Sequence, residues 1–385
     1  MTKNSSNIIK SFLNDFPEIF HSPQKVNAYL QDYSKNIEEI IVKDFVNFGL
    51  KDDFAIYANG GFGRQELYPS SDIDLSIIQK KKNINNSDNL EKFIAKLWDL
   101  GLQVGHSVRT IKDIKKIAKE DPKEFTSYLT RRPLLTNKKT DESINLALSK
   151  IWSKKKFYKV KLSEQEERYK SFFSTEYNLE PNLKESPGTL RDFQTSLWIL
   201  QHCFDLENID SIKKSKEFGN EIEEVINSYN FVKAMRYITN IISNKNRLTF
   251  EIQVEIADKA KLKEGTTKRS VEKLMQKFYE NASNLSNFNN LVFEKFKEQN
   301  QFAITKNYGD FFVRGSKIGL KKDANLEKQK ELIFDIFIAI GKSKKINAIE
   351  TSSMSLLKNN LNLIDTNFRN DQKHASKFLE ILKSQ

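Results

Sequence analysis

The segment that decides the fold is Tyr57-Ala-Asn-Gly-Gly-Phe-Gly-Arg-Gln-Glu-Leu-Tyr-Pro-Ser-Ser-Asp-Ile-Asp-Leu75. Asp72 and Asp74 stand two residues apart, and the branched apolar residues around and after Asp74 predict a buried strand. Because side chains alternate along a strand, both carboxylates project from one face. Two acids facing one way repel each other unless a divalent cation neutralises them, so the segment predicts a Mg²⁺ site, which commonly accompanies nucleotide phosphates.

The glycines ahead of the acids sharpen this prediction. A short strand over Phe54–Tyr57 runs into Gly60, Gly61 and Gly63, which permit a tight turn and a close approach of backbone N–H groups to an anion. We expect Arg64–Leu67 to begin a helical turn whose amino end favours phosphate. An ordinary glycine loop beside an Asp-rich turn is the alternative, but the whole string in this order favours nucleotidyl transfer.

Composition limits the class of protein. With 385 residues, 38% hydrophobic and 30% charged, the chain can form two or three folded domains, and no apolar run is long enough to span a bilayer. Cys203 is the only cysteine, which excludes an internal disulfide and a cysteine zinc site and favours the cytoplasm. The net charge is +12, but the lysines are spread along the chain without interleaved aromatics, so we do not expect a nucleic-acid surface.

The chain predicts an α+β fold in which a small mixed-sheet nucleotidyltransferase core precedes a large helical bundle. We expect a further core helix over Leu90–Trp98 and a third strand over Val104–Thr110. The predicted parts are N-terminal helices (1–50), the core (51–135), the bundle (136–300), and a small hairpin followed by helices (301–385).

Three blocks of sequence, in order, resemble one family. They are the glycine and aspartate segment, the stretch 97–110 (Leu-Trp-Asp-Leu-Gly-Leu-Gln-Val-Gly-His-Ser-Val-Arg-Thr), and the stretch 179–195, which contains Lys184-Glu-Ser-Pro-Gly-Thr-Leu-Arg-Asp192. Together they are similar to the bacterial PII uridylyltransferase/uridylyl-removing enzymes of the DNA polymerase β-like nucleotidyltransferase superfamily. This resemblance implies Mg²⁺-dependent transfer of UMP from UTP to a tyrosine of the PII signalling protein, with release of pyrophosphate.

The motif and the resemblance assign expected roles. Asp72 and Asp74 are the metal ligands and catalytic residues, and the expected nucleotide contacts are Gly60, Gly61, Gly63, Arg64, Ser71 and Arg109. Candidates for a general base or for other cleft contacts are Glu66, His106, Lys184 and Arg191.

Several of these assignments stay open on sequence alone. The strand over 104–110 lacks the third carboxylate that the superfamily usually supplies. His106 fits a core residue as well as a catalytic one, and Arg109 fits a phosphate contact or a surface ion pair. The charges of the block 184–192 fit contacts to nucleotide or PII as well as an arrangement that caps a helix.

The sequence also departs from the family. The family implies a metal-dependent hydrolase domain that removes UMP and paired domains that sense glutamine, yet none of the four histidines is followed by aspartate. We therefore expect this chain, whether a fragment, an excised piece or a short natural form, to add UMP and not remove it. The alternatives are adenylylation of glutamine synthetase or of a small alcohol by the same fold, and a catalytically silent module that binds nucleotide or PII.

Overall fold

The computed structural model describes residues 3–69, 71–81, 86–172, 175–262, 267–300, 305–321, 324–343 and 345–383. The chain divides into two compact units, Met1–Asn290 and Leu291–Gln385, and the boundary falls within helix α13. The predicted boundaries near 50 and 135 lie inside the first unit and stay a prediction.

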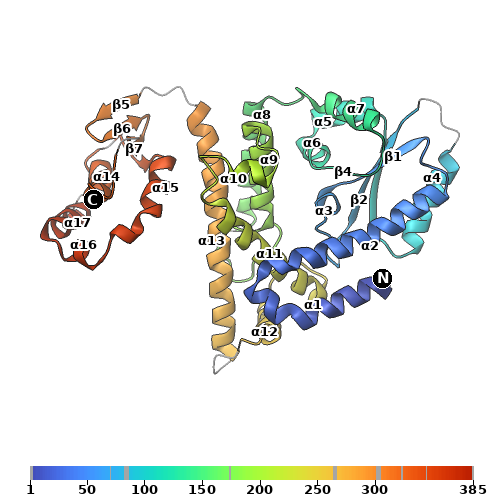
Figure 1. Ribbon diagram of the computed structural model, residues 1–385, viewed down its shortest axis with the longest axis horizontal. Helices are drawn as coiled ribbons and strands as arrows, with labels where there is room; N and C mark the ends of the chain where they lie inside the picture. The colour runs from blue at the N-terminus through green and yellow to red at the C-terminus, as the bar shows by residue number, and fades with distance from the viewer. Residues whose placement is uncertain are drawn as a thin grey trace. The chain divides into compact units, whose positions relative to one another are not determined.

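The first unit contains a mixed sheet and most of the helices (Figure 1). Its elements are α1 (Lys3–His21), η1 (Pro23–Lys25), α2 (Val26–Asn47), β1 (Phe54–Ala58), α3 (Gly60–Gly63), β2 (Ile73–Gln79), α4 (Ser87–Asp99), β3 (Val104–Arg109), α5 (Ile111–Glu120), α6 (Pro122–Leu129), β4 (Arg132–Leu135), α7 (Lys138–Leu148), α8 (Lys154–Lys170), α9 (Leu190–Phe204), α10 (Ile209–Lys213), α11 (Ile222–Ser243), α12 (Phe250–Lys259) and the first part of α13 (Thr267–Asn300).

The sheet has the strand order β3-β2-β1-β4. β2 pairs antiparallel with β1 and parallel with β3, and β4 pairs antiparallel with β1. This mixed sheet beside a helical bundle confirms the predicted α+β class.

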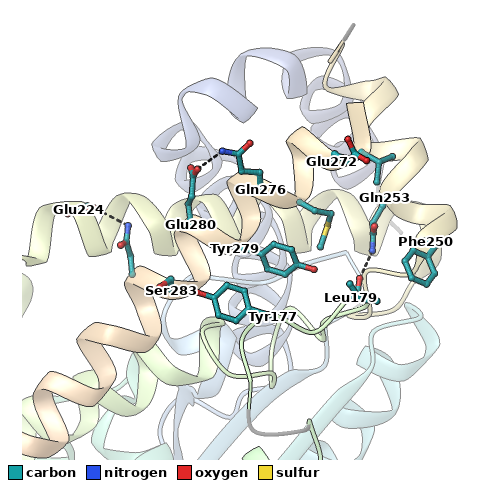
Figure 2. A pocket seen from close by; sticks show the side chains of 13 residues that line it. Tyr177, Leu179, Glu224, Phe250, Gln253, Glu272, Gln276, Tyr279, Glu280 and Ser283 are labelled. Atoms are coloured by element: carbon teal, nitrogen blue, oxygen red, sulfur yellow. Dashed lines mark hydrogen bonds between the residues drawn. The ribbon is translucent and has the colours of Figure 1, made fainter. Parts of the chain in front are cut away.

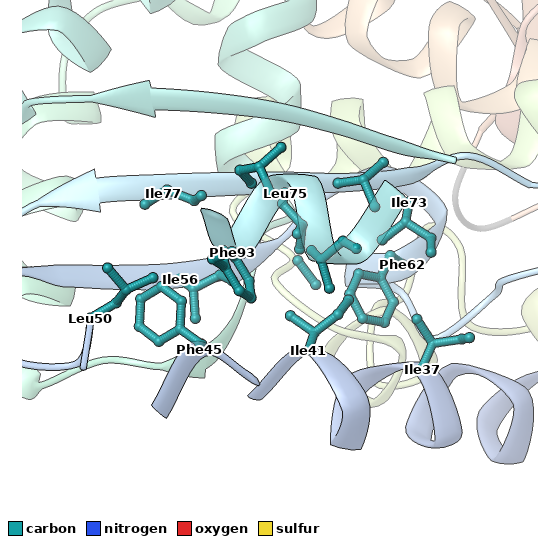
Figure 3. Close-up of a cluster of buried hydrophobic side chains, with 14 of the residues drawn as sticks. Ile37, Ile41, Phe45, Leu50, Ile56, Phe62, Ile73, Leu75, Ile77 and Phe93 are labelled. Atoms are coloured by element: carbon teal, nitrogen blue, oxygen red, sulfur yellow. The ribbon is translucent and has the colours of Figure 1, made fainter. Parts of the chain in front are cut away.

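One face of the sheet is covered by α2 and α4 (Figure 3). Ile37, Ile41 and Phe45 of α2 and Phe93 of α4 pack against the apolar side chains of β1 and β2. Ile73, Leu75 and Ile77 of β2 belong to this cluster, so the alternate residues of the strand, Asp74 among them, face the other way. The apolar half of the strand thereby fixes the direction of its acids.

The N-terminal helices pack against both the sheet layer and the helical bundle. α2 contacts α4 and β4 and also α11, while α1 contacts α2, α11 and α12. α9 packs on α8 and α11. At the start of α9, Gly188 has a φ of +71° and touches α13, since a Cβ there would lie 2.4 Å from the carbonyl oxygen of Ala282. Only glycine permits this approach of the loop to the helix.

The second unit contains the end of α13 and a four-stranded sheet of order β5-β6-β7-β8. Its elements are β5 (Thr305–Tyr308), β6 (Phe311–Arg314), β7 (Lys317–Leu320), α14 (Leu332–Gly341), β8 (Ala348–Ile349), α15 (Thr351–Asn359), η2 (Leu361–Leu363), α16 (Thr366–Asn370) and α17 (Gln372–Lys383). A separate apolar cluster around Ile318, Ile336 and Phe368 forms its core.

Some local predictions were wrong. The helical turn after β1 is Gly60–Gly63 itself, and Arg64–Leu67 does not continue it because Gln65 adopts a φ of +56°. Strand β4 and the parallel pairing of β8 with β7 were not predicted, so the expected hairpin is part of a larger sheet. The first four residues of the predicted part 301–385 lie outside the described residues. Across the described ranges, none of the helices combines the length and the apolar composition needed to cross a bilayer.

Candidate active site

A cavity of about 650 Å³ in the first unit brings the sheet and the bundle together. Nine of the twelve predicted site residues line it: Gly60, Gly61, Arg64, Glu66, Ser71, Asp72, Asp74, Lys184 and Arg191. The opposite wall comes from α6, α8, α9 and α11 and carries side chains of both charges beside Trp198. The sheet and the bundle, far apart in sequence, therefore form one site.

Asp72 and Asp74 lie just before and within β2, and both expose their side chains to the cavity. The cavity walls shield Asp74 from bulk water and, together with the negative charge of Asp72, raise the pKa of its carboxyl. Mutual repulsion of this kind is what the sequence predicted for two unneutralised acids on one face.

Two glycines leave room around the Asp74 carboxylate. Gly60, with a φ of +55°, would place a Cβ 2.7 Å from Oδ2, and Gly105, which pairs with Asp74 across β2 and β3, would place one 3.3 Å from Oδ1. Both oxygens are therefore bordered by bare backbone instead of side chains. The third strand, in which the sequence offered no third acid, supplies part of this space.

These donors fit a Mg²⁺ that is shared with a nucleotide. In the part of the chain that the structure describes, His, Cys, Asp and Glu form no group of three suited to a metal. Mg²⁺ at nucleotide sites is bound by one or two carboxylates and completes its shell with phosphate oxygens and water. Asp72 and Asp74, close enough to shift a pKa and open to the cavity, would supply the protein's part of that shell.

Glu66 ties the glycine turn to the bundle. Its carboxylate accepts hydrogen bonds from Arg64 Nε (2.9 Å) and from the hydroxyl of Tyr229 on α11 (2.9 Å), and it lies 3.6 Å from Lys233 Nζ. Burial acts to raise the pKa of Glu66, but Lys233 and Arg64 hold it below its ordinary value. Because this carboxylate is buried, ionised and fully engaged, it holds Arg64 in place and is poorly suited to act as a general base.

The block 184–192 forms part of the bundle wall. Arg191 pairs with Glu185 at 3.0 Å and stacks over Trp198, with 5.7 Å from its guanidinium carbon to the ring centre. Burial, with the charges of Arg191 and Arg236, lowers the pKa of Lys184. Helix α9 begins at Leu190, after Pro187 and Gly188.

Asp192 has a structural role within the block 184–192. It is fully buried and accepts hydrogen bonds from Gly188 N (2.7 Å), Arg168 Nη2 (2.6 Å) and the hydroxyl of Tyr169 (2.6 Å). This carboxylate holds the loop to helix α8, whereas Lys184 and Arg191 reach the cavity. The block contains both a structural anchor and cavity residues.

Three predicted residues lie outside the cavity lining. Arg109 makes a two-point ion pair with Glu124 (2.5 and 3.1 Å) and donates to Tyr128, so the expected phosphate contact is replaced by an ion pair between β3 and α6. His106 is exposed and lies against Trp98, with ring centres 5.9 Å apart. Gly63 packs closely against the end of β1, because a Cβ at this position would lie only 2.8 Å from the Ala58 carbonyl oxygen.

Sequence reasoning missed Gly105, Trp198 and Arg236 as parts of the site. Arg236 lies in the largely apolar stretch 229–238 of α11, in which every residue is buried and Lys233 is the other charged residue. A charged residue inside such a run was the available signal, since buried arginines are rare unless a partner neutralises them.

A second hollow of about 900 Å³ lies between α12, α13 and the loop around Leu179 (Figure 2). Tyr177, Tyr279 and Phe250 line it together with Glu224, Glu272 and Glu280, and neither lysine nor arginine is among its lining residues. Its negative charge would repel a nucleoside triphosphate, so the cavity that contains Asp72 and Asp74 is the candidate active site.

Comparison with known proteins identifies relatives of the chain. Residues 156–293 match the family model described as GlnD PII-uridylyltransferase, and residues 311–385 match the model of the uridylyltransferase GlnD third domain. The chain is 30% identical over 382 residues to the bifunctional uridylyltransferase/uridylyl-removing enzyme of Ectopseudomonas mendocina, with 94% of this chain and 42% of the relative aligned.

Two further relatives carry the same description. The protein of Hydrogenovibrio crunogenus is 30% identical over 97% of this chain and 44% of its own length, and that of Pseudomonas aeruginosa strain LESB58 is 28% identical over 98% and 43%. The chain thus spans less than half of the length of these curated relatives. The two family models, which together match more than half of the chain, and the relatives aligned over almost all of it show that the chain belongs to the GlnD uridylyltransferase family, as the three sequence blocks predicted.

Proposed function

We propose that this chain is a Mg²⁺-dependent nucleotidyltransferase that moves UMP from UTP to a tyrosine hydroxyl of PII and releases pyrophosphate. The observation that carries the proposal is the open pair of acids at the start of β2, which shares a cavity with a bundle wall on which lysines and arginines outnumber the acids. Family membership supports the choice of UTP and PII, because the relatives are described as uridylyltransferases and one matching family model names PII.

In this mechanism the chain positions the reactants. The backbone of the turn at Gly60 and Gly61 faces the cavity and would bind phosphate oxygens, with Arg64 held beside it by Glu66. Asp72 and Asp74 would hold the metal, which neutralises charge at the reacting phosphate when it is bound. Ser71 lines the same cavity, but its hydroxyl already accepts a hydrogen bond from Tyr68 N (3.2 Å), so it stabilises the loop that carries Asp72.

The transfer is an in-line exchange at the α-phosphorus. A bond forms between the tyrosine oxygen and the α-phosphorus, the bond to the bridging oxygen breaks, and pyrophosphate leaves with that electron pair. The phenolic proton goes to solvent or to a base; a phenol has a pKa near ~10, so it needs this help at neutral pH. His106 lies outside the cavity lining and Glu66 is engaged, so we assign the base role to neither.

The test is incubation of the chain with PII, Mg²⁺ and each of the four nucleoside triphosphates, labelled at the α-phosphate. The proposal predicts label on one tyrosine of PII from UTP, and loss of labelling when EDTA removes the metal. Preferential labelling from ATP would replace the proposal by adenylylation, and binding of UTP without pyrophosphate release would identify a silent module. The reducing cytoplasm is the compartment that we propose for the reaction, and the single cysteine, Cys203, is buried.

A further inference from the structure

Most charges on the cavity walls neutralise each other. The internal pairs are Arg64 with Glu66 (2.9 Å), Lys161 with Glu164 (2.8 Å), Arg168 with Asp192 (2.6 Å) and Arg191 with Glu185 (3.0 Å). Among the described residues, Asp72 and Asp74 beside β2 form no ion pair. On the bundle wall, Arg236, Lys123 and Glu167 likewise form none, and Lys184 has only Glu185 at 4.0 Å. The charge left without a close partner is therefore acidic beside β2 and net basic on the bundle, where Arg236 and Lys184 are the candidates for binding an anion.

Arg236 is the more unusual of the two cations. Its side chain is nearly buried, with 9% of the residue exposed, yet no described carboxylate lies within ion-pair distance. Nε donates to Asn246 Oδ1 at 2.7 Å, and the guanidinium carbon lies 4.0 Å from the ring centre of Tyr68. These contacts fix the orientation of the guanidinium but do not neutralise it. A desolvated cation without a counter-ion is unfavourable, and an anionic ligand in the cavity would supply the missing charge.

Lys184 interacts electrostatically with both Arg236 and Asp74. Its nearest carboxylate is Glu185 at 4.0 Å, and Glu185 is already held by Arg191 at 3.0 Å. The pKa of Lys184 is lowered by burial, then by Arg191 and Arg236, and the negative charges of Glu185 and Asp74 act in the opposite direction. Lys184 is thus an electrostatic neighbour of both the cationic wall and the metal-binding acids.

We propose that Lys184 and Arg236 form an anion subsite that binds the two distal phosphates of the nucleotide, the part that leaves as pyrophosphate. The inference rests on the proposed function for the identity of the nucleotide. Both cations line the cavity that contains Asp72 and Asp74, so a triphosphate whose α-phosphate lies at the acids would direct its distal phosphates to Lys184 and Arg236. Negative charge grows on this end as the bond to the α-phosphorus breaks, and ionised donors stabilise that charge.

This assignment differs from a contact to uracil, ribose or PII in what it predicts for binding. A subsite for the distal phosphates affects every ligand that contains them and leaves a nucleoside monophosphate unaffected. We therefore measure the affinities of UTP, inorganic pyrophosphate and UMP by calorimetry, with Mg²⁺, for the wild-type chain and for Arg236→Gln and Lys184→Gln. The matched control is Arg247→Gln, which removes an exposed arginine that pairs with Glu180 next to Asn246.

Each of the two cavity variants should weaken UTP and pyrophosphate binding by about 10- to 100-fold, the range expected for a lost hydrogen bond to a charged group. UMP affinity should change less than about threefold, and Arg247→Gln should bind all three ligands like the wild-type chain, because surface pairs contribute little. Arg236→Lys should recover part of the loss, since it restores the charge without the planar guanidinium.

Thermal unfolding separates a binding role from a structural one. Without ligand, Arg236→Gln should melt within a few degrees of the wild-type chain, because the substitution removes a desolvated charge that no carboxylate balances. The rise in melting temperature that pyrophosphate causes should fall with the affinity. A large drop in the melting temperature without ligand, together with unchanged pyrophosphate affinity, would overturn the subsite and make Arg236 a structural residue.

The experiment distinguishes failure of the subsite from failure of the proposed function. If the wild-type chain transfers UMP and both variants bind pyrophosphate normally, the subsite is wrong and the function stands. If the wild-type chain transfers no UMP but its pyrophosphate affinity depends on Lys184 and Arg236, the function is wrong and the subsite stands. An equal loss of UMP and UTP affinity would assign the cations to the nucleoside or the α-phosphate and refute the subsite.

Discussion

Replacing Gly60 by alanine tests the geometry of the acid pair. Gly101→Ala is the matched control, because it causes the same backbone strain without a contact to Asp74. Gly60 and Gly101 both have a positive φ, +55° and +73°. An alanine at either position adopts a strained left-handed backbone, which costs about 1–2 kcal/mol. Only at Gly60 does the new Cβ also meet a neighbour, Asp74 Oδ2 at 2.7 Å; at Gly101 it meets nothing within 4 Å.

The additional contact should change activity more than stability. The new Cβ would clash with Asp74 Oδ2, at the end of a side chain that can rotate away without moving the backbone. Gly60→Ala and Gly101→Ala should therefore lower the free energy of unfolding by similar amounts, about 1–2 kcal/mol. A rotated Asp74 no longer holds its ligand in place, and a displacement of about 1 Å at a reacting centre can lower the rate by about 10²-fold.

The assay pairs urea unfolding of each variant with the rate of labelled UMP transfer to PII. We expect Gly60→Ala to lose about 100-fold in rate and Gly101→Ala to lose less than about threefold. Equal rates for the two variants would mean that the position of the Asp74 carboxylate does not matter for transfer, in contradiction to its proposed role.

Two further variants test the buried ion pairs. Glu66→Gln should lower the free energy of unfolding by about 3–5 kcal/mol at pH 7, because Arg64 and Lys233 lose their counter-ion. The pKa of Glu66 is lowered in the folded state, so this stabilisation is present above the unfolded pKa of ~4.3 and is lost as the pH falls further; urea titrations at pH 7 and pH 4 should give a smaller difference at pH 4. In the second unit, Lys317→Met leaves the buried Glu298 without its 3.0 Å partner, and hydrogen exchange of β6 and β7 should show a loss of about 3 kcal/mol, with no change in β1 and β2.

The sheet half of the site was predictable because its determinants are local in sequence. The glycine turn and Asp72-Ile-Asp74 lie within fifteen residues, and strand periodicity alone places both acids on one face. The helical turn was predicted over Arg64–Leu67 but lies at Gly60–Gly63. The prediction failed because Gln65 adopts a positive φ, which is uncommon for residues other than glycine.

The bundle half depended on contacts that sequence does not encode locally. Arg236 reaches the cavity only because α1 and α2 join α11 to the sheet, and Gly105 faces Asp74 only through the register of β2 and β3. Arg109 was assigned to phosphate from its charge and position in a matching strand, but the start of α6 presents Glu124 to it first. Competition between a ligand and a neighbouring side chain for one cation is decided by packing.

The most direct test of the account is UMP transfer by a chain in which the acids keep their shape and lose their charge. Asp74→Asn should fold, since Asp74 is exposed in the cavity, and should raise the free energy of unfolding slightly by relieving its repulsion from Asp72. The account predicts that this variant transfers no detectable labelled UMP from UTP to PII in Mg²⁺, while the wild-type chain labels one tyrosine. Transfer by Asp74→Asn at the wild-type rate would contradict the claim that the paired carboxylates of β2 carry the metal and the reaction.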